Sequence, residues 1–520
     1  MWPGIVSFSC ATAAWGQLPE PTAPASPPAI AADAPPDTIL RENELPIDLD
    51  TALRLAGSQN PELMAARERV TEAVALRQLA AAQALPNLNA GANYNLHHGP
   101  LQQSDGNILK VNRDALYVGM GANAIGGGSP TIPGLNYNLN VGAAWFTLLQ
   151  SRQNVTRAAA AARTSENDTL LRTALAYTDL LRATGRRAIA VQNRSDAAEL
   201  ARITAAYARA GQGRKADADR AAVELRLRDA ELVQSEAMML SASARLCQIL
   251  NLDPSTRLRP IDGWVVPASI VPDPTPLQDL IGIALLQRPE LAERRAEIQQ
   301  AMLALSSAKL LPFSPNVILG FSAGGFGGGS NRAEERGEPR FGRFGGRTDF
   351  DAVVFWTAQN LGVGNLAQIR GAGSVARQAG FRELDTLNRV RAEVAESQAR
   401  AAARFLQIDS TSRAVDASRD AFTEDMVRIR GRQGLPIEAV DSMRLLGRSR
   451  YEYLDAIIDY NRAQFQLYVA LGQPPANALA RPVPASLVPP PDAATPLPAP
   501  APLPTDGVKP VSATVPSVQP

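Results

Sequence analysis

Two stretches of the sequence begin alike: QNPELMAARERVTEA at residues 59–73 and QRPELAERRAEIQQA at residues 287–301. Each places Pro-Glu-Leu at the head of a charged, alanine-rich pattern with helical spacing. Proline suits the first turn of a helix, and a glutamate there complements the helix dipole. We therefore expect Pro61 and Pro289 each to start a long helix after a short one, and the chain to contain a repeat.

The composition limits the classes of protein to consider. The 520 residues carry a net charge of +1, so no overall field points to nucleic acid as a partner. Aromatic residues make up only 5% of the chain, which is little for a conventional globular core, whereas alanine and leucine fill its middle, as in long helices packed through small side chains. No run of about 18 apolar residues occurs, which argues against a transmembrane helix.

Alternating stretches follow each of the two helices. They cover residues 87–96 and 136–146 in the first copy, and 316–323 and 348–356 in the second. Apolar residues occupy one face and mostly Asn, Asp or Gly the other, and a span of about ten residues is typical of a tilted transmembrane strand. Asparagine disfavours strands, so its face needs a reason, and a water-filled lumen supplies one. A half-buried strand of a soluble sheet is the alternative. We expect residues 97–135 and 324–346 to be loops.

Long helical patterns follow each pair of strands, over residues 150–250 and 365–471. Each pattern breaks at a glycine-containing tip, AGQGRKAD (210–217) and GRQGLPIE (431–438). Helices of about 60 residues would extend roughly 90 Å. The pattern predicts two long helical hairpins with coiled-coil-like packing.

The chain therefore divides into two repeats with tails. We expect a leader and a Pro/Ala-rich disordered segment over residues 1–46, repeat 1 over 47–260, a linker over 261–275, repeat 2 over 276–472 and a Pro-rich disordered tail over 473–520. The first 15 residues hold a short apolar stretch and an Ala-x-Ala site but no basic residue, so they resemble an incomplete signal peptide. Cys10 is a possible lipid acceptor; a removed or disordered leader is the alternative.

Four strands cannot close a barrel around a channel, because open edges in lipid would leave backbone groups unpaired. Three copies of the chain would supply twelve strands, an even number within the range of known barrels. The predicted fold is thus mostly α-helical with a membrane β-barrel part, in which two structural repeats of a long helical hairpin and a two-stranded β-hairpin form a trimeric 12-stranded barrel continued by an α-helical tunnel.

The doubled order, the NPEL and RPEL heads, both tips and the closing helix YNRAQFQLYVALGQPP (460–475) together resemble the bacterial outer membrane efflux protein family, the TolC-like channel-tunnels. The resemblance covers residues 47–475. It implies a homotrimer in the outer membrane with its helices in the periplasm, paired with a periplasmic adaptor and an inner-membrane pump. The junction WFTLLQSRQNV (145–155) departs from the family because it lacks the expected Pro and Gly.

The resemblance also implies a periplasmic gate at the tips, formed by Asp217, Glu438 and Asp441, although Glu438 stands where the family has Asp. Glu438 and Asp441 are three residues apart, hence on one helix face, and threefold symmetry would make a ring of carboxylates that attracts cations. The alternative is that they are solvated carboxylates at a helix start.

Further candidate residues surround these positions. We expect adaptor contacts at the tips from Gly211, Gly213, Arg214, Gly434 and Leu435. Basic tip residues either link neighbouring hairpins or solvate the tips: Arg209, Arg214, Lys215, Arg430 and Arg432. Four aromatic residues near predicted strand ends suggest a membrane girdle, with ordinary sheet packing as the alternative: Tyr94, Tyr137, Trp145 and Trp356.

Several motifs fail as sites of chemistry. GGFGGGSNR (324–332) lacks the lysine of a phosphate-binding loop, and the adjacent His97 and His98 in a predicted loop make a poor metal site. Cys247 has apolar neighbours and is predicted to lie in the core. With no nucleophile–base pair, metal site or cofactor motif, we expect no enzyme. The leading hypothesis is a channel serving as the exit duct of a tripartite efflux system, passing small molecules passively; the alternatives are a type I protein secretion duct and a non-channel periplasmic coiled-coil scaffold.

Overall fold

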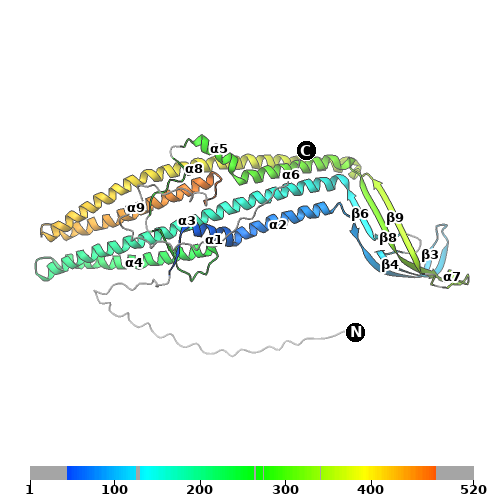
Figure 1. Cartoon of the computed structure of the whole chain (residues 1–520), viewed down its shortest axis with the longest axis horizontal. Helices are drawn as coiled ribbons and strands as arrows, with labels where there is room; N and C mark the ends of the chain where they lie inside the picture. Colours follow the sequence, from blue (N-terminus) through cyan, green and yellow to red (C-terminus); the bar gives the residue numbers. More distant parts are fainter. Residues whose placement is uncertain are drawn as a thin grey trace, which may run out of the picture.

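The computed structural model describes residues 44–124, 129–262, 265–272, 275–339, 341–342 and 344–475. It is elongated, with a β-sheet at one end and the tips of two helical hairpins at the other (Figure 1). The predicted leader with Cys10 lies outside the described residues, as does nearly all of the predicted Pro-rich tail.

The two Pro-Glu-Leu heads start matching helices. In the first repeat α1 (Leu49–Gln59) precedes α2 (Pro61–Ala82); in the second α5 (Leu277–Gln287) precedes α6 (Pro289–Leu310). The short helices both have 11 residues and the long ones both have 22. Each proline occupies the first turn, so the prediction that each starts a long helix after a short one is confirmed.

Two helical hairpins form the length of the molecule. They comprise α3 (Val141–Arg209) with α4 (Lys215–Leu250), and α8 (Val363–Arg430) with α9 (Pro436–Ala470). The outgoing helices have 69 and 68 residues, and the returning ones 36 and 35. Both breaks fall within the predicted glycine-containing tips. The corresponding helices of the two hairpins are therefore nearly equal in length.

The long helices lie side by side. α3 packs against α2 and α6, and α6 in turn packs against α8 (Figure 1). Among the described residues, none of the helices has a stretch that is both long and apolar enough to cross a membrane.

The core is densest midway along the helices. There β1 (Leu45–Ile47) pairs in parallel with β7 (Leu258–Pro260), beside a buried cluster that includes Leu53, Tyr177 and Leu246. The Tyr177 hydroxyl donates a 2.5 Å hydrogen bond to Asp262, and burial together with that carboxylate raises the pKa of Tyr177. These contacts tie the start and end of repeat 1 to the middle of α3.

The closing helix α9 fixes the segment that connects the repeats. The Asn461 side chain donates to the Val266 carbonyl at 2.9 Å and accepts from the Ala268 N–H at 2.7 Å. Buried Gln464 accepts from the N–H groups of Ile270 and Val271 at 3.1 and 3.0 Å. The polar residues of the YNRAQ motif therefore hold backbone that would otherwise be unpaired.

The sheet has four strand positions side by side, here called columns, and a column holds either one strand or two that follow one another along the same line. Column 1 contains β2 (Asn87–Leu88) and β3 (Ala90–Gln102). Column 2 contains β4 (Ile108–Ala122) followed by β6 (Leu135–Asn140), while the two-residue β5 (Ile132–Pro133) pairs back on β4. Column 3 is β8 (Asn316–Ser330), and column 4 is β9 (Gly345–Phe355). β8 pairs with β6 over its first part and with β4 over its second, so β4 and β6 share one column.

Two predicted loops contain long pieces of strand. Residues 97–135 contain the end of β3, with His97 and His98 in it, and the whole of β4; residues 324–330 belong to β8. The glycine run is a strand because large rings pack over its bare backbone. A Cβ on Gly325 would lie 2.3 Å from the ring of Phe344, and one on Gly324 would lie 2.8 Å from the ring of Tyr117.

The predicted strand over residues 136–146 is too long, because β6 ends at Asn140 and α3 begins at Val141. The Asn140 side chain accepts a 2.9 Å hydrogen bond from the Ala143 N–H and so caps the helix. It also donates to the Ser314 carbonyl at 3.3 Å. Trp145 therefore lies in the first turns of α3 and not on a strand.

Candidate functional site: the tips and the two faces of the sheet

The two tips are held against each other at one end of the molecule (Figure 1). The Tyr207 hydroxyl, near the end of α3, donates to the carbonyls of Ile429 and Arg430 at the end of α8, both at 3.2 Å. Arg430 also pairs with Glu199 of α3 at 3.3 Å. Arg430 thus links the two hairpins of this chain; within the described part of the chain, Arg209, Arg214, Lys215 and Arg432 form no ion pair.

The three predicted gate carboxylates lie in the first turns of the returning helices α4 and α9. Glu438 accepts a 3.3 Å hydrogen bond from the Leu435 N–H and lies 3.7 Å from Arg428, so it also caps its own helix. Asp217 pairs with Arg220 at 3.3 Å. Asp441 lies 3.9 Å from Arg444 with 69% of its side chain exposed, which makes it the least engaged of the three.

The predicted adaptor-contact residues form the two turns. A Cβ on Gly213 would lie 3.1 Å from Tyr207 Cβ, and one on Gly434 would lie 3.0 Å from Arg428 Cβ, so each glycine lets its turn close against the helix it leaves. Gly211 has a φ of +70°, and Leu435 is 61% exposed. Arg214 and Leu435 occupy the position just before α4 and α9, respectively. Both turns expose large side chains to solvent, Gln212 and Arg214 in the first and Arg432, Gln433 and Leu435 in the second.

A buried carboxylate behind the tips was not expected from the sequence. Glu224 of α4, with 1% of its side chain exposed, accepts from Arg228 at 2.5 and 3.1 Å and from Arg444 of α9 at 2.7 and 3.0 Å. Burial alone would raise the pKa of Glu224, but the hydrogen bonds from the two guanidinium groups outweigh it, and the pKa lies below its usual range. Glu224 therefore joins the two returning helices.

An ion-pair ladder continues this connection toward the middle of the molecule. Two of the arginines belong to α3 and two to α9, and successive pairs move in opposite directions along the two helices, as antiparallel packing requires. The pairs are Arg450 with Asp196, Arg186 with Asp455, Arg182 with Asp459, and Arg462 with Asp179. These half-buried pairs fix the register of repeat 1 against repeat 2.

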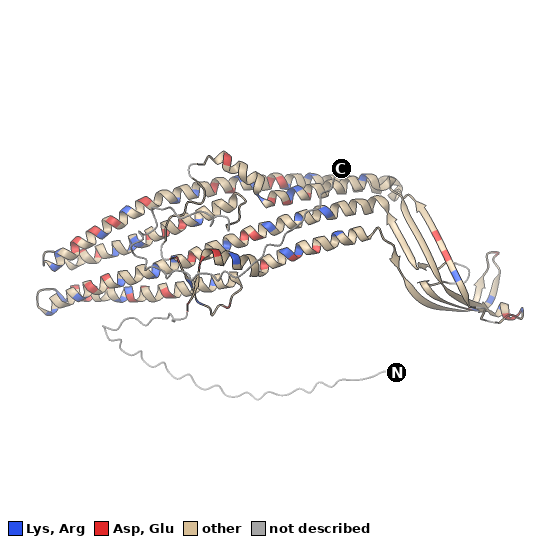
Figure 2. Ribbon diagram, in the orientation of Figure 1, with Lys and Arg blue, Asp and Glu red and all other residues tan. Residues whose placement is uncertain are grey.

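The two faces of the sheet differ in chemistry. One face exposes large apolar side chains: Leu88, Tyr94, Leu96, Phe350 and Val354. A 320 Å³ groove on this face is lined mainly by Pro86, Leu135, Tyr137, Leu319, Phe321 and Phe350. The opposite face, called here the asparagine face, carries Asn87, Asn89, Asn93, Asn95, Asn136, Asn138, Asn140 and Asn316. Charged side chains gather on the helices, whereas the sheet is mainly uncharged except for part of β9 and its far end (Figure 2).

Three of the four predicted girdle residues lie near the junction of sheet and helices. Trp356 directly follows β9 and donates from its Nε1 to the Phe313 carbonyl at 3.2 Å. Tyr137 lies on β6 and Trp145 at the start of α3, whereas Tyr94 lies further along the sheet on β3. The sequence prediction missed Phe313 and Leu361 at this junction, although they are 77% and 98% exposed; both stand in non-periodic turns.

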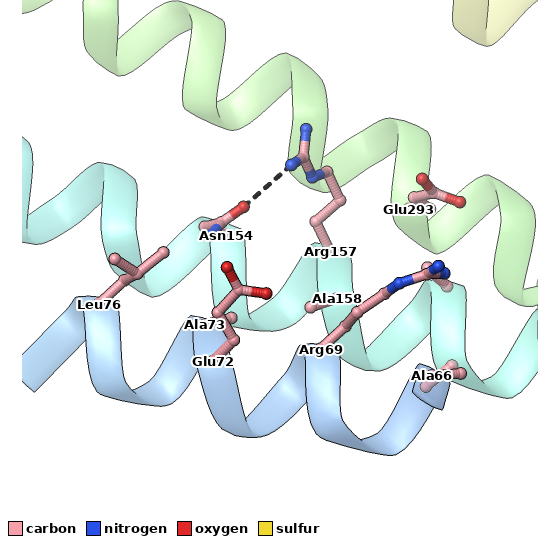
Figure 3. A pocket seen from close by; sticks show the side chains of 11 residues that line it. Ala66, Arg69, Glu72, Ala73, Leu76, Asn154, Arg157, Ala158 and Glu293 are labelled. Atoms are coloured by element: carbon pink, nitrogen blue, oxygen red, sulfur yellow. Dashed lines mark hydrogen bonds between the residues drawn. The ribbon is translucent and has the colours of Figure 1, made fainter. Parts of the chain in front are cut away.

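The helical part carries a groove lined by α2 and α3, with one residue from α6. It has a volume of 340 Å³, and alanines of α2 and α3 form much of its lining (Figure 3). Arg69, Glu72 and Glu293 stand at its rim, and Arg157 donates to Asn154 at 3.0 Å. The lining has no nucleophile beside a base. Within the described residues no group of three His, Cys, Asp or Glu side chains could hold a metal, and Cys247 is buried in the core as predicted.

Solved structures with a similar fold include outer-membrane channels. The outer-membrane channel OprN has 21% identity and a TM-score of 0.64, with 82% of this chain and 89% of that chain covered. A membrane protein from Pseudomonas aeruginosa has 18% identity and a TM-score of 0.67, with 82% and 93% covered. The MtrE outer-membrane channel of Neisseria gonorrhoeae, solved in its open state, has 19% identity and a TM-score of 0.61, with 82% and 89% covered.

This chain has the fold of those outer-membrane channels. The predicted resemblance is thereby confirmed at the level of the fold. No protein-family model matches the sequence, and no curated protein matches it. Because these identities are low, they establish the fold alone. The function is inferred from the tips and the sheet described above.

Proposed function

We propose that the chain is the outer-membrane channel of a tripartite efflux system and conducts small molecules passively from the periplasm to the exterior. The observation that carries the proposal is the four-column sheet, which exposes an apolar face, an asparagine face and two free edges at the end of two long helical hairpins. In this proposal the protein performs no chemistry of its own and needs no cofactor.

The free edges support a homotrimer. Among the described strands, β3 pairs with β4 alone and β9 with β8 alone, so the outer edges of columns 1 and 4 carry unpaired backbone groups. Lipid would leave those groups unsatisfied. Pairing column 1 of one copy with column 4 of the next closes a ring, and three copies give twelve columns. The helices of the three copies would then continue the barrel as a tunnel.

The two faces support insertion in the outer membrane. Exposed Tyr94, Phe350 and Val354 suit lipid, and the asparagine face suits a water-filled lumen. A periplasmic coiled-coil scaffold would leave this apolar face in water, which disfavours that alternative. The same architecture would also serve a type I secretion duct, so the class of cargo is decided by transport assays.

The tips support contact with a periplasmic adaptor that bridges to an inner-membrane pump. Their exposed turn residues Gly211, Arg214 and Leu435 project beyond the bundle, and the adjoining carboxylates of Asp217, Glu438 and Asp441 would form the periplasmic gate. In a trimer, three copies of each carboxylate would surround the axis and favour cations.

Membrane fractionation and planar-bilayer recording test the proposal. We expect the protein in the outer-membrane fraction and discrete conductance steps from the purified trimer. Recovery only in the soluble periplasmic fraction, or a monomer without conductance, would contradict it.

The gate has its own test. Glu438→Gln combined with Asp441→Asn should lower the cation-to-anion permeability ratio, because the ring loses its charge. Glu452→Gln is the matched control, since Glu452 lies on the same helix away from the tip and pairs with Arg448 at 2.7 Å. Equal ratios in the double variant and the control would return both residues to the role of solvated helix-start carboxylates.

A further inference from the structure

Column 2 of the sheet is interrupted between β4 and β6. The described residues of this interval are Asn123, Ala124 and Ser129–Gly134, and together they are called here the inner strap. Column 3 runs without a break past the same height, from the part of β8 that pairs with β6 to the part that pairs with β4. The interruption therefore inserts chain without widening the sheet.

Hydrogen bonds place the inner strap on the asparagine face. The Asn93 side chain accepts from the Ala124 N–H at 3.1 Å and donates to the Ala124 carbonyl at 3.4 Å. The Asn89 side chain donates to the Pro133 carbonyl at 2.8 Å. Ser322 of β8, which is 2% exposed, accepts from the Gly134 N–H at 3.1 Å. The inner strap is thus fastened to columns 1 and 3 and crosses column 2.

The sheet is shaped to receive the inner strap. Gly320 of β8 lies beneath Pro133, and a Cβ there would come within 2.9 Å of the proline ring. Ala124 and Tyr117 are both 0% exposed. Tyr117 belongs to the asparagine face, because it pairs with Asn93 across the β3–β4 ladder. A closely packed crossing held by four side-chain hydrogen bonds is a built feature.

We propose that the inner strap is a fixed constriction of the barrel lumen and selects solutes by size. The inference rests on the proposed function, since only closure by other copies turns the asparagine face into a lumen. Three straps would then project toward the axis at one height. None of the described strap residues is ionisable, whereas the tips carry carboxylates. The barrel would therefore discriminate by width and the tips by charge, which disfavours folded-protein cargo.

A cysteine probe tests where the inner strap lies. Ser129 is an exposed strap residue, and Ser129→Cys can form a mixed disulfide with a trimethylammonium methanethiosulfonate, which releases methanesulfinate. We expect modification to lower single-channel conductance by about a third or more, because the added group occupies the lumen. Tyr94→Cys, on the apolar face, is the matched control and should show no change. Wild-type protein treated with the same reagent controls for buried Cys247. Unchanged conductance of modified Ser129→Cys would overturn the proposal.

Releasing the inner strap tests its role in selection. Asn93→Ala with Ser322→Ala removes two fastenings, and Asn95→Ala is the control, because Asn95 shares the asparagine face and, within the described chain, has no bond to the strap. We expect at least an approximately 1.5-fold larger conductance and a higher cut-off for graded polyethylene glycols, with an unchanged cation-to-anion ratio. An unchanged cut-off in a folded trimer that conducts would overturn the strap while leaving the channel intact. A wild-type protein that fails to conduct would overturn both.

Discussion

The two repeats have nearly the same helix lengths but fasten their corresponding junctions with different side chains. Before α2, Asn60 has φ −67° and ψ 124°; before α6, Arg288 has φ −67° and ψ 122°. Asn60 accepts from the N–H groups of Glu62 and Leu63 and so caps its helix, whereas Arg288 forms no cap and pairs with Glu393 at 2.5 Å. The proline that follows restricts both residues to extended backbone, so the geometry of the head does not depend on the cap.

The junctions between sheet and helix differ more. In repeat 1, Asn140 ends β6 and caps α3 directly. In repeat 2, a short turn with Asn360, Leu361 and Gly362 at positive φ separates β9 from α8. Helix lengths and the backbone of the Pro-Glu-Leu heads are thus nearly the same in both halves, whereas the sheet–helix turns and the fastening contacts are particular to each.

We expect the largest loss of stability when the Glu224 carboxylate, which joins α4 to α9, is removed. Glu224→Gln leaves Arg228 and Arg444 without their shared buried carboxylate and should cost about 3 kcal/mol of unfolding free energy. Denaturant unfolding of the detergent-solubilised protein, followed by circular dichroism, measures the loss. Asp441→Asn is the matched control, because Asp441 is the exposed second partner of Arg444, 3.9 Å away. A similar loss in both variants would show that Glu224 is not the principal connection.

The same carboxylate predicts a dependence on pH. The pKa of Glu224 is lower in the folded protein than its ordinary value of 4.5, so its contribution is complete above that value and is lost as the pH falls through the folded pKa. The stability difference between wild type and Glu224→Gln should be constant near neutral pH and shrink below about pH 4.5. Unfolding curves at pH 7, 5 and 3 would show this; a difference independent of pH would contradict the assignment.

The two helix heads should respond unequally to truncation. Asn60→Ala removes the cap and the 2.8 Å bond to the Ile249 carbonyl, and should cost about 1–2 kcal/mol. Arg288 is only 10% exposed, but its partners Glu393 and Glu290 are 40% and 30% exposed, so Arg288→Ala leaves no fully buried charge unpaired and should cost less than about 1 kcal/mol. Thermal unfolding of both variants gives the comparison. Asn60→Asp retains the capping oxygen and controls for the lost donor; equal losses for the two alanine variants would refute the asymmetry.

The smallest effect is a stabilisation at the second sheet–helix junction. Leu361 has a φ of +58° and is 98% exposed, so Leu361→Gly removes backbone strain without emptying a core, although glycine loosens the unfolded chain. We expect a gain of about 0.5–1 kcal/mol in unfolding free energy. Val363→Gly, in the first turn of α8, should instead be destabilising. A loss at position 361 would mean that the exposed leucine makes a contact in the assembled protein.

Much of this fold follows from sequence periodicity. The helix heads, the tips and the four sheet columns are visible in it, because each is a local pattern repeated in both halves. The misassigned segments depend on distant partners. The strand over residues 324–330 needs rings from Tyr117 and Phe344 to cover its glycines, and Asn140 looks like another inward asparagine until its side chain caps α3.

Some residues of the candidate site can be recognised from the sequence, and others cannot. Glu438 and Asp441 could be located from their spacing beside a tip. Glu224 could not, because its partner Arg444 lies 220 residues later and nothing local distinguishes it from other helical glutamates. The inner strap is also invisible in the sequence, since its position depends on side chains from three separate strands or turns.

The contacts of α9 have a consequence for the order of folding. Among the described helices α9 comes last, yet its Arg462 reaches α3, its Arg444 reaches α4, and its Asn461 holds the segment between the repeats. Contacts this distant in sequence are late to form. During synthesis, these contacts between the two halves can therefore form only after α9 has left the ribosome.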